Sequence, residues 1–340
     1  MNAKKDLVII NNEKISKNNE SFYCDNVDMK SIPEGLNESF KVTLIARKSK
    51  IERTRKINLE RIVVSSNIFK FFSKILGTLK KDQTNYLIIS ITPYTFFAYL
   101  LLLLSRKKVF VYLRSNGFEE YKAILGFIGP AIYYVMFKIV TFKSNIIVCQ
   151  EQLFKKRKCE IVFPSEINSL WLENLQEPAL DKPRLLYVGR IKVEKGIFSL
   201  LKIFDEINED FNLSIVGSDN DKNQKRNKIK YIGHGYDANE LVKIYDKNNI
   251  SILPSFTEAH PKVIDESLSR KRPVIIFKEI EHIIQNRKGI FVANRNANSL
   301  MEIISFIMKN YKNIQASMEE NKLPTKKEFI SKMSNILNSN

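Results

Sequence analysis

The chain reads Pro254-Ser-Phe-Thr-Glu-Ala-His-Pro-Lys-Val-Ile-Asp-Glu266, and this stretch decides the fold because it joins a strand to a helix. The apolar run 250–254 predicts a buried strand, and residues 262–269 predict the helix that follows, with Pro261 suited to its first turn. A second apolar run, 273–277, predicts the next strand. A strand, a helix and a strand in this order predict a β-α-β unit, and therefore a parallel sheet of an α/β fold.

Glu258 and Glu266 stand in this stretch with seven residues between them, across the junction of strand and helix. In a β-α-β unit the helix N-terminus lies at the carboxyl edge of the sheet, where backbone N–H groups and the helix dipole favour a phosphate. We expect Glu258 to reach a bound sugar and Glu266 to accept hydrogen bonds from ribose hydroxyls. Taken alone, the pair also fits a solvated helix face, because 37 acidic residues offer many such spacings.

A second motif lies upstream, where residues 185–190 read Leu-Leu-Tyr-Val-Gly-Arg and are followed by Lys195-Gly196. The apolar run predicts a strand, and Gly189 lets the chain turn away from it. Arg190 and Lys195 can then bring two cations to a diphosphate, because the arginine fork binds two oxygens at once. Residues 211–217 and 231–233 predict the next two strands.

With both motifs in this order, residues 183–300 resemble the retaining GT-B glycosyltransferases of the family-4 type, the glycosyl transferases group 1. The resemblance implies two Rossmann-like domains whose parallel sheets face each other across a cleft. It also implies transfer of a sugar from an NDP-sugar to a saccharide or polyprenyl-linked acceptor, with retention at the anomeric carbon, in surface polysaccharide or glycan biosynthesis. Neither a metal nor a cofactor besides the NDP-sugar donor is expected.

The resemblance also implies roles for single residues. Arg190 and Lys195 would stabilise the charge that develops on the leaving diphosphate, and Glu258 would orient the sugar, so these three are the expected catalytic residues. The expected donor-binding residues are Gly189, Arg190, Lys195, His260, Lys262, Val263 and Glu266. For His260 two positions remain open, lining the sugar pocket or packing in the interior, and we favour the first.

The first half of the chain departs from the family pattern. No glycine-rich loop follows the first apolar run, since no glycine occurs before Gly35, and the domain lacks the histidine with which family members often contact the sugar. Arg114, in Tyr-Leu-Arg-Ser-Asn-Gly, follows a predicted strand near the position of that residue. We therefore treat Arg114 as a possible acceptor or sugar contact, with an ordinary surface loop as the alternative.

These patterns predict an acceptor-binding domain over 1–165, a linker over 166–183 rich in Glu, Asn and Pro, and a nucleotide-sugar domain over 184–340. Helical periodicity over 300–337 predicts terminal helices, and the resemblance implies that the last one crosses back to the first domain. Two rival functions remain open: a nucleotide-sugar 2-epimerase or hydrolase of the GT-B type, and a noncatalytic binder of nucleotide-sugars or polyanions.

Charge is concentrated in the first half, where residues 1–165 carry +14 of the total +18. Basic runs at 47–61, 106–108 and 155–158 would attract an anionic membrane, although a solvated lysine-rich surface is an equal alternative. Nucleic acid is not expected as a partner, because the aromatic residues lie in apolar runs and do not alternate with the basic ones.

Two apolar stretches have nearly the length of a membrane span. The first, 87–104, fits better as strand 86–91 and helix 95–105, followed by strand 109–113; the second, 123–142, is interrupted by Gly129-Pro130 and could be interfacial. The three cysteines have no metal-ligand spacing and suggest a reducing compartment. With no signal peptide recognised, we expect a cytoplasmic protein attached peripherally to the inner face of the membrane.

Overall fold

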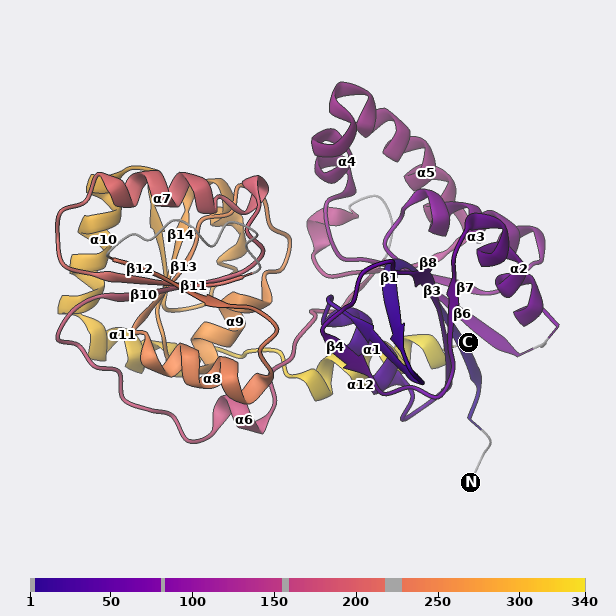
Figure 1. Cartoon of the computed structure of the whole chain (residues 1–340), viewed down its shortest axis with the longest axis horizontal. Helices are drawn as coiled ribbons and strands as arrows, with labels where there is room; N and C mark the ends of the chain where they lie inside the picture. Colours follow the sequence, from indigo (N-terminus) through magenta and orange to yellow (C-terminus); the bar gives the residue numbers. More distant parts are fainter. Residues whose placement is uncertain (1–3, 81–82, 155–158, 218–227, 340) are drawn as a thin grey trace. The chain divides into compact units, whose positions relative to one another are not determined.

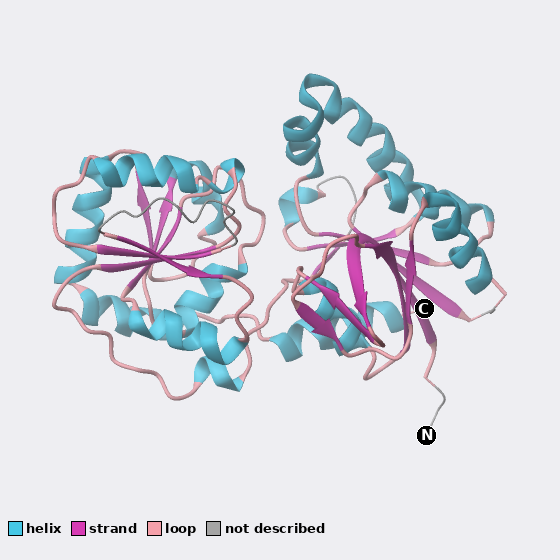
Figure 2. Ribbon diagram, in the orientation of Figure 1, coloured by secondary structure: helices cyan, strands magenta, loops and turns pink. Residues whose placement is uncertain are grey.

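The computed structural model describes residues 4–80, 83–154, 159–217 and 228–339, so the basic run 155–158 and most of the loop 219–230 lie outside it. The chain divides into two units, Met1–Pro164 with Lys327–Asn340, and Ser165–Lys326 (Figure 1). Each unit has its own sheet, built mainly or entirely of parallel strands, with helices on both faces (Figure 2). The predicted α/β fold with two parallel-sheet domains is therefore confirmed.

The sheet of the first unit has seven parallel strands in the order β5-β3-β1-β6-β7-β8-β9. They are β1 (Asp6–Asn18), β3 (Lys41–Lys48), β5 (Ile62–Ser65), β6 (Thr84–Ile89), β7 (Val109–Leu113), β8 (Asn145–Val148) and β9 (Glu160–Ile161). Two short strands, β2 (Ser21–Cys24) and β4 (Arg55–Ile57), extend the second half of β1 in antiparallel pairing.

Helices cover both faces of this sheet. On one face lie α2 (Ile68–Thr78), α3 (Pro93–Leu104) and α5 (Gly129–Lys143), and on the other lie α1 (Asp28–Leu36) and α12 (Lys326–Asn338) (Figure 1). The helix α3 begins at a capping box in which Thr92 and Thr95 satisfy each other's backbone N–H groups, followed by Pro93 in the first turn. The first apolar stretch therefore forms the strand β6 and the helix α3, which pack into the core of the first unit.

The second apolar stretch forms two helices, α4 (Gly117–Leu125) and α5, joined by a single turn of 3-10 helix, η1 (Gly126–Ile128). Gly126 has a φ of +64°, a left-handed value that ends α4 and that only glycine adopts readily. Within the described residues, the segment from Gly117 to Lys143 is the one that is long and apolar enough to cross a membrane.

The last helix, α12, packs into the first unit. Its apolar residues Phe329, Met333 and Leu337 are buried, and the ring of Phe329 lies 6.3 Å from that of Tyr112 in β7. The side chain of Asn85 donates to the carbonyl of Leu337 over 2.7 Å. The core of the first unit is therefore completed by a helix that follows the second unit in the chain.

The sheet of the second unit is entirely parallel, with the order β12-β11-β10-β13-β14-β15. Its strands are β10 (Arg184–Val188), β11 (Asn212–Val216), β12 (Ile229–Gly233), β13 (Ile250–Leu253), β14 (Val274–Phe277) and β15 (Ile290–Ala293). The helices are α6 (Ser169–Leu172), α7 (Ile197–Asp205), α8 (Ala238–Lys247), α9 (Lys262–Ser269), α10 (Ala297–Lys309) and α11 (Tyr311–Ser317). Along β10, Leu185 and Tyr187 pack with α7 and α10, whereas Leu186 packs with α8.

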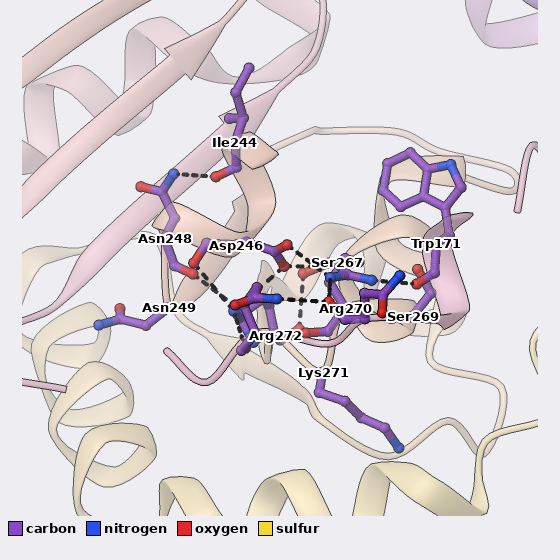
Figure 3. A network of polar contacts seen from close by, with 12 residues as sticks. Trp171, Ile244, Asp246, Asn248, Asn249, Ser267, Ser269, Arg270, Lys271 and Arg272 are labelled. Carbon is purple, nitrogen blue, oxygen red and sulfur yellow. Dashed lines mark hydrogen bonds and ion pairs between the residues drawn. The ribbon is translucent and has the colours of Figure 1, made fainter. Parts of the chain in front are cut away.

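Residues 166–183 are not a linker, which corrects the sequence expectation. They belong to the second unit, where Trp171 of α6 is buried against the ring of Tyr245. Their backbone is held by two buried arginines that follow α9 (Figure 3). Arg270 donates to the carbonyls of residues 171, 173 and 174, and Arg272 donates to that of residue 176.

Asp246, at the end of α8, supplies the countercharge for both arginines. Its carboxylate accepts two hydrogen bonds from Arg270, at 2.9 and 2.8 Å, and lies 3.6 Å from Arg272 (Figure 3). A bidentate pair of this kind fixes the orientation of both groups. The segment that looks polar and exposed in the sequence is therefore anchored through its main chain.

Candidate functional site

The two sequence motifs meet at the carboxyl edge of the second sheet. The strands β10 and β13 are parallel neighbours, so the loops that follow them lie side by side. Gly196, at the start of α7, has a φ of +68°, and a Cβ atom placed on it would lie 1.8 Å from the carbonyl oxygen of Pro254. Only glycine permits this approach, and it brings Lys195 against the loop that carries Glu258.

Lys195 and Glu258 form an ion pair at this edge. The Nζ atom of Lys195 lies 2.5 Å from Oε1 of Glu258, which also accepts a hydrogen bond from the hydroxyl of Ser255 over 2.7 Å. The two side chains are largely shielded, with exposed fractions of 20% and 11%. The structure thus joins one predicted catalytic residue from each motif, 63 positions apart in the chain.

Gly189 and Arg190 follow β10 directly. A Cβ atom on Gly189 would lie 2.8 Å from the hydroxyl of Tyr187, and this hydroxyl donates to the carbonyl of Arg190 over 2.7 Å. The side chain of Arg190 is exposed and makes no ion pair or hydrogen bond with the part of the chain that the structure describes. Its charge is available to a ligand at the edge of the sheet.

Glu266 is buried inside α9, where its Oε2 atom accepts a hydrogen bond from Tyr245 over 3.0 Å. Burial raises the pKa of Glu266 above its ordinary value, against the opposing effects of Lys262 and the Tyr245 hydroxyl. Lys262 itself lies 3.6 Å from Glu166, and the carbonyl of Val263 lies 3.4 Å from the Tyr245 hydroxyl. These three residues occupy the first turns of α9, next to the loop that carries Glu258.

His260 packs in the interior, so its position matches the alternative that we did not favour. Its side chain is 4% exposed, and Nε2 lies 2.9 Å from Oδ2 of Asp265, whose other oxygen pairs with Arg287. Burial alone would raise the pKa of Asp265, but the hydrogen bond with His260 and the charge of Arg287 hold it below its ordinary value. A direct contact between His260 and the donor stays a prediction.

Arg295 is a residue that sequence reasoning missed. It follows β15, and its guanidinium is stacked 4.1 Å from the ring of Phe256 and 4.4 Å from that of Phe277, with Nε donating to Glu279 over 2.7 Å. Its Nη1 atom is buried, has no hydrogen-bond partner in the described part of the chain, and lies 3.3 Å from a Cβ placed on Gly196.

Arg295 therefore adds a third cation beside Lys195 and Arg190. No local motif marks it, because it stands between two asparagines in a polar loop. A usable signal is the short apolar run 290–293 before it, for which we predicted no strand and which forms β15, since the loops that follow parallel strands gather at one edge of the sheet.

Arg114 lies in the first unit, at the carboxyl end of β7. It pairs with Asp28 of α1 over 3.0 Å and is partly buried, so it is not part of an ordinary surface loop. Glu13, in β1, belongs to the same group of charges: burial raises its pKa, and the charge of Arg114 opposes this rise. A role for Arg114 in acceptor or sugar binding stays a prediction.

In the second unit, Arg190, Lys195 and Arg295, together with the N-terminus of α7, can bind an anion. The carboxylate of Glu258 beside them can accept hydrogen bonds from a sugar. Among the residues that the structure describes, no group of three or more His, Cys, Asp and Glu side chains could hold a metal ion.

Known proteins share both the sequence pattern and the fold. Residues 173–323 match the family model described as "Glycosyl transferases group 1". A protein of Bacillus subtilis, provisionally named as the teichuronic acid biosynthesis glycosyltransferase TuaC, is 28% identical over 37% of this chain and 33% of its own length. The chain spans half or less of the length of the curated relatives that it matches.

Many solved structures match the chain, several of them over nearly its whole length. Sucrose-phosphate synthase from Thermosynechococcus elongatus superposes with a TM-score of 0.69 and 16% identity, covering 98% of each chain. HepE from Anabaena, in complex with UDP and glucose, superposes with a TM-score of 0.68 and 12% identity, covering 99% of this chain and 100% of its own. At sequence identities of 16% and 12%, these two matches show similarity of the fold alone.

Proposed function

We propose that this chain, which has the GT-B fold and matches the glycosyl transferases group 1 over residues 173–323, is a glycosyltransferase that uses an NDP-sugar. The observation that carries the proposal is the ion pair of Lys195 and Glu258, which joins the two motifs at the carboxyl edge of the second sheet. The sugar would pass to a saccharide or polyprenyl-linked acceptor, with retention and without a metal, in surface polysaccharide or glycan biosynthesis.

The charges of the site fit the demands of this reaction. Negative charge develops on the leaving diphosphate, and Lys195, Arg190 and the N-terminus of α7 can stabilise it without a metal. Lys195 is held by Glu258, whose carboxylate also accepts a hydrogen bond from Ser255. The Glu258 carboxylate, held in this position, can orient the sugar.

A donor screen tests the proposal. Thermal unfolding would be followed by fluorimetry with UDP, GDP, ADP and CMP, because a ligand that binds only the folded chain raises its melting temperature. The matching NDP-sugar would then be incubated with and without acceptor saccharides. Stabilisation by one nucleotide and sugar transfer support the proposal; donor turnover without an acceptor would favour the epimerase or hydrolase, and binding without turnover the noncatalytic binder.

The two glutamates should affect different measurements. Glu266→Ala should weaken NDP affinity about tenfold or more, because it removes hydrogen bonds from ribose to a charged group. Glu258→Ala should mainly lower turnover with the intact sugar donor and leave bare NDP binding nearly unchanged. Titration calorimetry and initial rates separate the two effects, with Glu302→Ala on the exposed face of α10 as control. Equal losses of bare NDP affinity in both variants would contradict this division of roles.

NDP affinity should also depend on the protonation of Glu266. Ribose hydroxyls donate to the ionised carboxylate, and burial raises the pKa of Glu266, so affinity should fall as pH is lowered through this raised value. The fall should begin at a higher pH than an ordinary glutamate would give. Calorimetry across a pH series, with Glu266→Gln as a variant that cannot titrate, checks this; an identical pH dependence in both proteins would exclude Glu266 as its source.

We also propose that the protein attaches peripherally to the inner face of an anionic membrane, where a polyprenyl-linked acceptor would lie. The +14 charge of residues 1–165 supports this attachment. The protein should cosediment with anionic vesicles at low salt, ignore neutral ones, and lose binding as the Debye length shrinks toward about 3 Å at roughly 1 M salt.

Charge position provides the control for this attachment. Reversal to Glu at the exposed Lys70, Lys74 and Lys138 of the first unit should reduce cosedimentation. The same reversal at the exposed Lys202, Lys243 and Lys309 of the second unit should reduce it less. Equal losses from both sets would mean that general charge, and not the first unit, carries the attraction.

A further inference from the structure

The helices α4 and α5 form a hairpin that packs on itself. A Cβ atom on Gly117 would lie 2.0 Å from the ring of Tyr133, and one on Gly129 would lie 2.0 Å from the carbonyl oxygen of Tyr121. The rings of Tyr121 and Tyr133 are 5.2 Å apart. The glycines thus allow the two helices to approach closely, and the turn η1 forms the tip of the hairpin (Figure 1).

The outer surface of this hairpin is apolar. Phe127, in the turn η1, is 91% exposed, which is extreme for a phenylalanine. The other exposed apolar side chains of the hairpin are Ile124, Leu125, Ile128, Ile132, Tyr134, Val135, Ile139 and Phe142. Single exposed apolar residues are normal in soluble proteins, but nine of them within residues 124–142 indicate an interaction surface.

The 27 residues from Gly117 to Lys143 are together long and apolar enough to cross a membrane, but the hairpin into which they fold is too short to do so. Its helices have 9 and 15 residues, which gives lengths of about 14 Å and about 22 Å, short of the roughly 30 Å of a bilayer core. The hairpin is connected to one sheet at both ends, because α4 follows β7 and α5 leads into β8, the parallel neighbour of β7. The tip can therefore enter a surface, but the chain returns on the same side.

Charge identifies the partner. Lys122, in the last turn of α4, is exposed near Phe127, and Lys138 and Lys143 are exposed beside the apolar residues farther along α5. The acidic residues of the hairpin, Glu119 and Glu120, lie in the first turn of α4. A surface on which lysines border apolar side chains complements an anionic lipid bilayer, in which charged headgroups lie above an apolar interior.

We propose that the hairpin inserts its Phe127 end into the headgroup region of an anionic phospholipid bilayer. This specifies the contact that makes the membrane attachment, and it rests on that part of the proposed function. Lys122, in the last turn of α4, would lie at the phosphate level, while the apolar side chains around the turn reach the upper acyl chains.

A tryptophan placed at the tip tests the insertion. The chain has one tryptophan, Trp171, which is 1% exposed and therefore serves as a constant background. In Phe127→Trp, adding anionic vesicles should shift the new emission to shorter wavelength, and vesicles of brominated lipid should quench it. The matched control is Phe306→Trp, at a 51% exposed position of α10 in the second unit, whose emission should not change.

A second variant measures how much the tip contributes. Phe127→Ser should weaken binding to anionic vesicles about tenfold or more, because it removes a large apolar side chain from the buried contact. Phe306→Ser should bind the vesicles as the natural chain does. Nucleotide binding should be unchanged in both.

Three outcomes would overturn the proposal. Vesicle binding without a change in the Phe127→Trp emission would leave membrane attachment intact but place the contact elsewhere. A shift that grows with protein concentration in the absence of lipid would identify a second copy of the chain as the partner. An emission that is already shifted in dilute protein and insensitive to lipid would mean that the tip is covered within the chain. None of these outcomes involves the sugar donor, so each is distinct from failure of the proposed transfer reaction.

Discussion

Asp246→Asn is expected to lower the free energy of unfolding by about 3–5 kcal/mol, the typical loss when one partner of a buried ion pair is removed. Arg270 and Arg272 are each 1% exposed, and Asp246 is the carboxylate that pairs with both. The amide keeps the size of the side chain but cannot balance two buried guanidinium charges. Urea unfolding followed by fluorescence of Trp171, whose carbonyl accepts a hydrogen bond from Arg270, reports directly on this region.

Asp210→Asn is the matched control, because Asp210 also pairs with a cation of the second unit, Lys182, but is 77% exposed. An exposed pair of this kind contributes about 0–1 kcal/mol. If the two variants unfolded at the same urea concentration, the network around Asp246 would not anchor residues 171–176 as described.

The second large effect is expected at the phosphate site. Arg190→Ala and Lys195→Ala should each remove a charge-assisted contact worth about 1.5–3 kcal/mol, which corresponds to a loss of NDP affinity of roughly tenfold to a hundredfold. Turnover should fall as well, since the same charges stabilise the leaving diphosphate. Calorimetry with the nucleotide found in the donor screen, combined with initial rates, measures both quantities.

Lys192→Ala serves as control, because Lys192 is an exposed cation three positions before Lys195. It should bind NDP as the natural chain does. Wild-type affinity in both Arg190→Ala and Lys195→Ala would refute the assignment of the phosphate site, while an equal loss in Lys192→Ala would indicate a general effect of charge.

Local patterns were enough to predict the elements around the site. The apolar runs before Pro254 and Gly189 are the strands β13 and β10, and residues 262–269 form α9, because strand, turn and helix signals lie next to each other in the sequence. The pairing of Lys195 with Glu258 follows from two neighbouring parallel strands, so the meeting of their loops was foreseeable.

Contacts between distant residues were not foreseeable in the same way. Arg270 and Arg272 look like surface charges after a helix, and only the folded chain shows that their partners lie between residues 171 and 176, almost a hundred positions away. Arg295 was missed for a similar reason, because its stacking partner Phe256 lies on another loop. From the sequence we placed the interruption of the apolar stretch 123–142 at Gly129-Pro130, whereas the glycine with a positive φ is Gly126. Composition alone does not indicate which glycine adopts this conformation.

The return of α12 to the first unit has a consequence for biosynthesis. Residues 327–340 are made after the second unit, yet Phe329, Met333 and Leu337 fill the core of the unit that is made before it. At a translation rate of about 5–20 residues per second, the synthesis of that helix is complete only about nine to thirty-five seconds after residue 164. During this interval the apolar face of the first unit is open to chaperones, and the second unit, whose residues are continuous, can fold first.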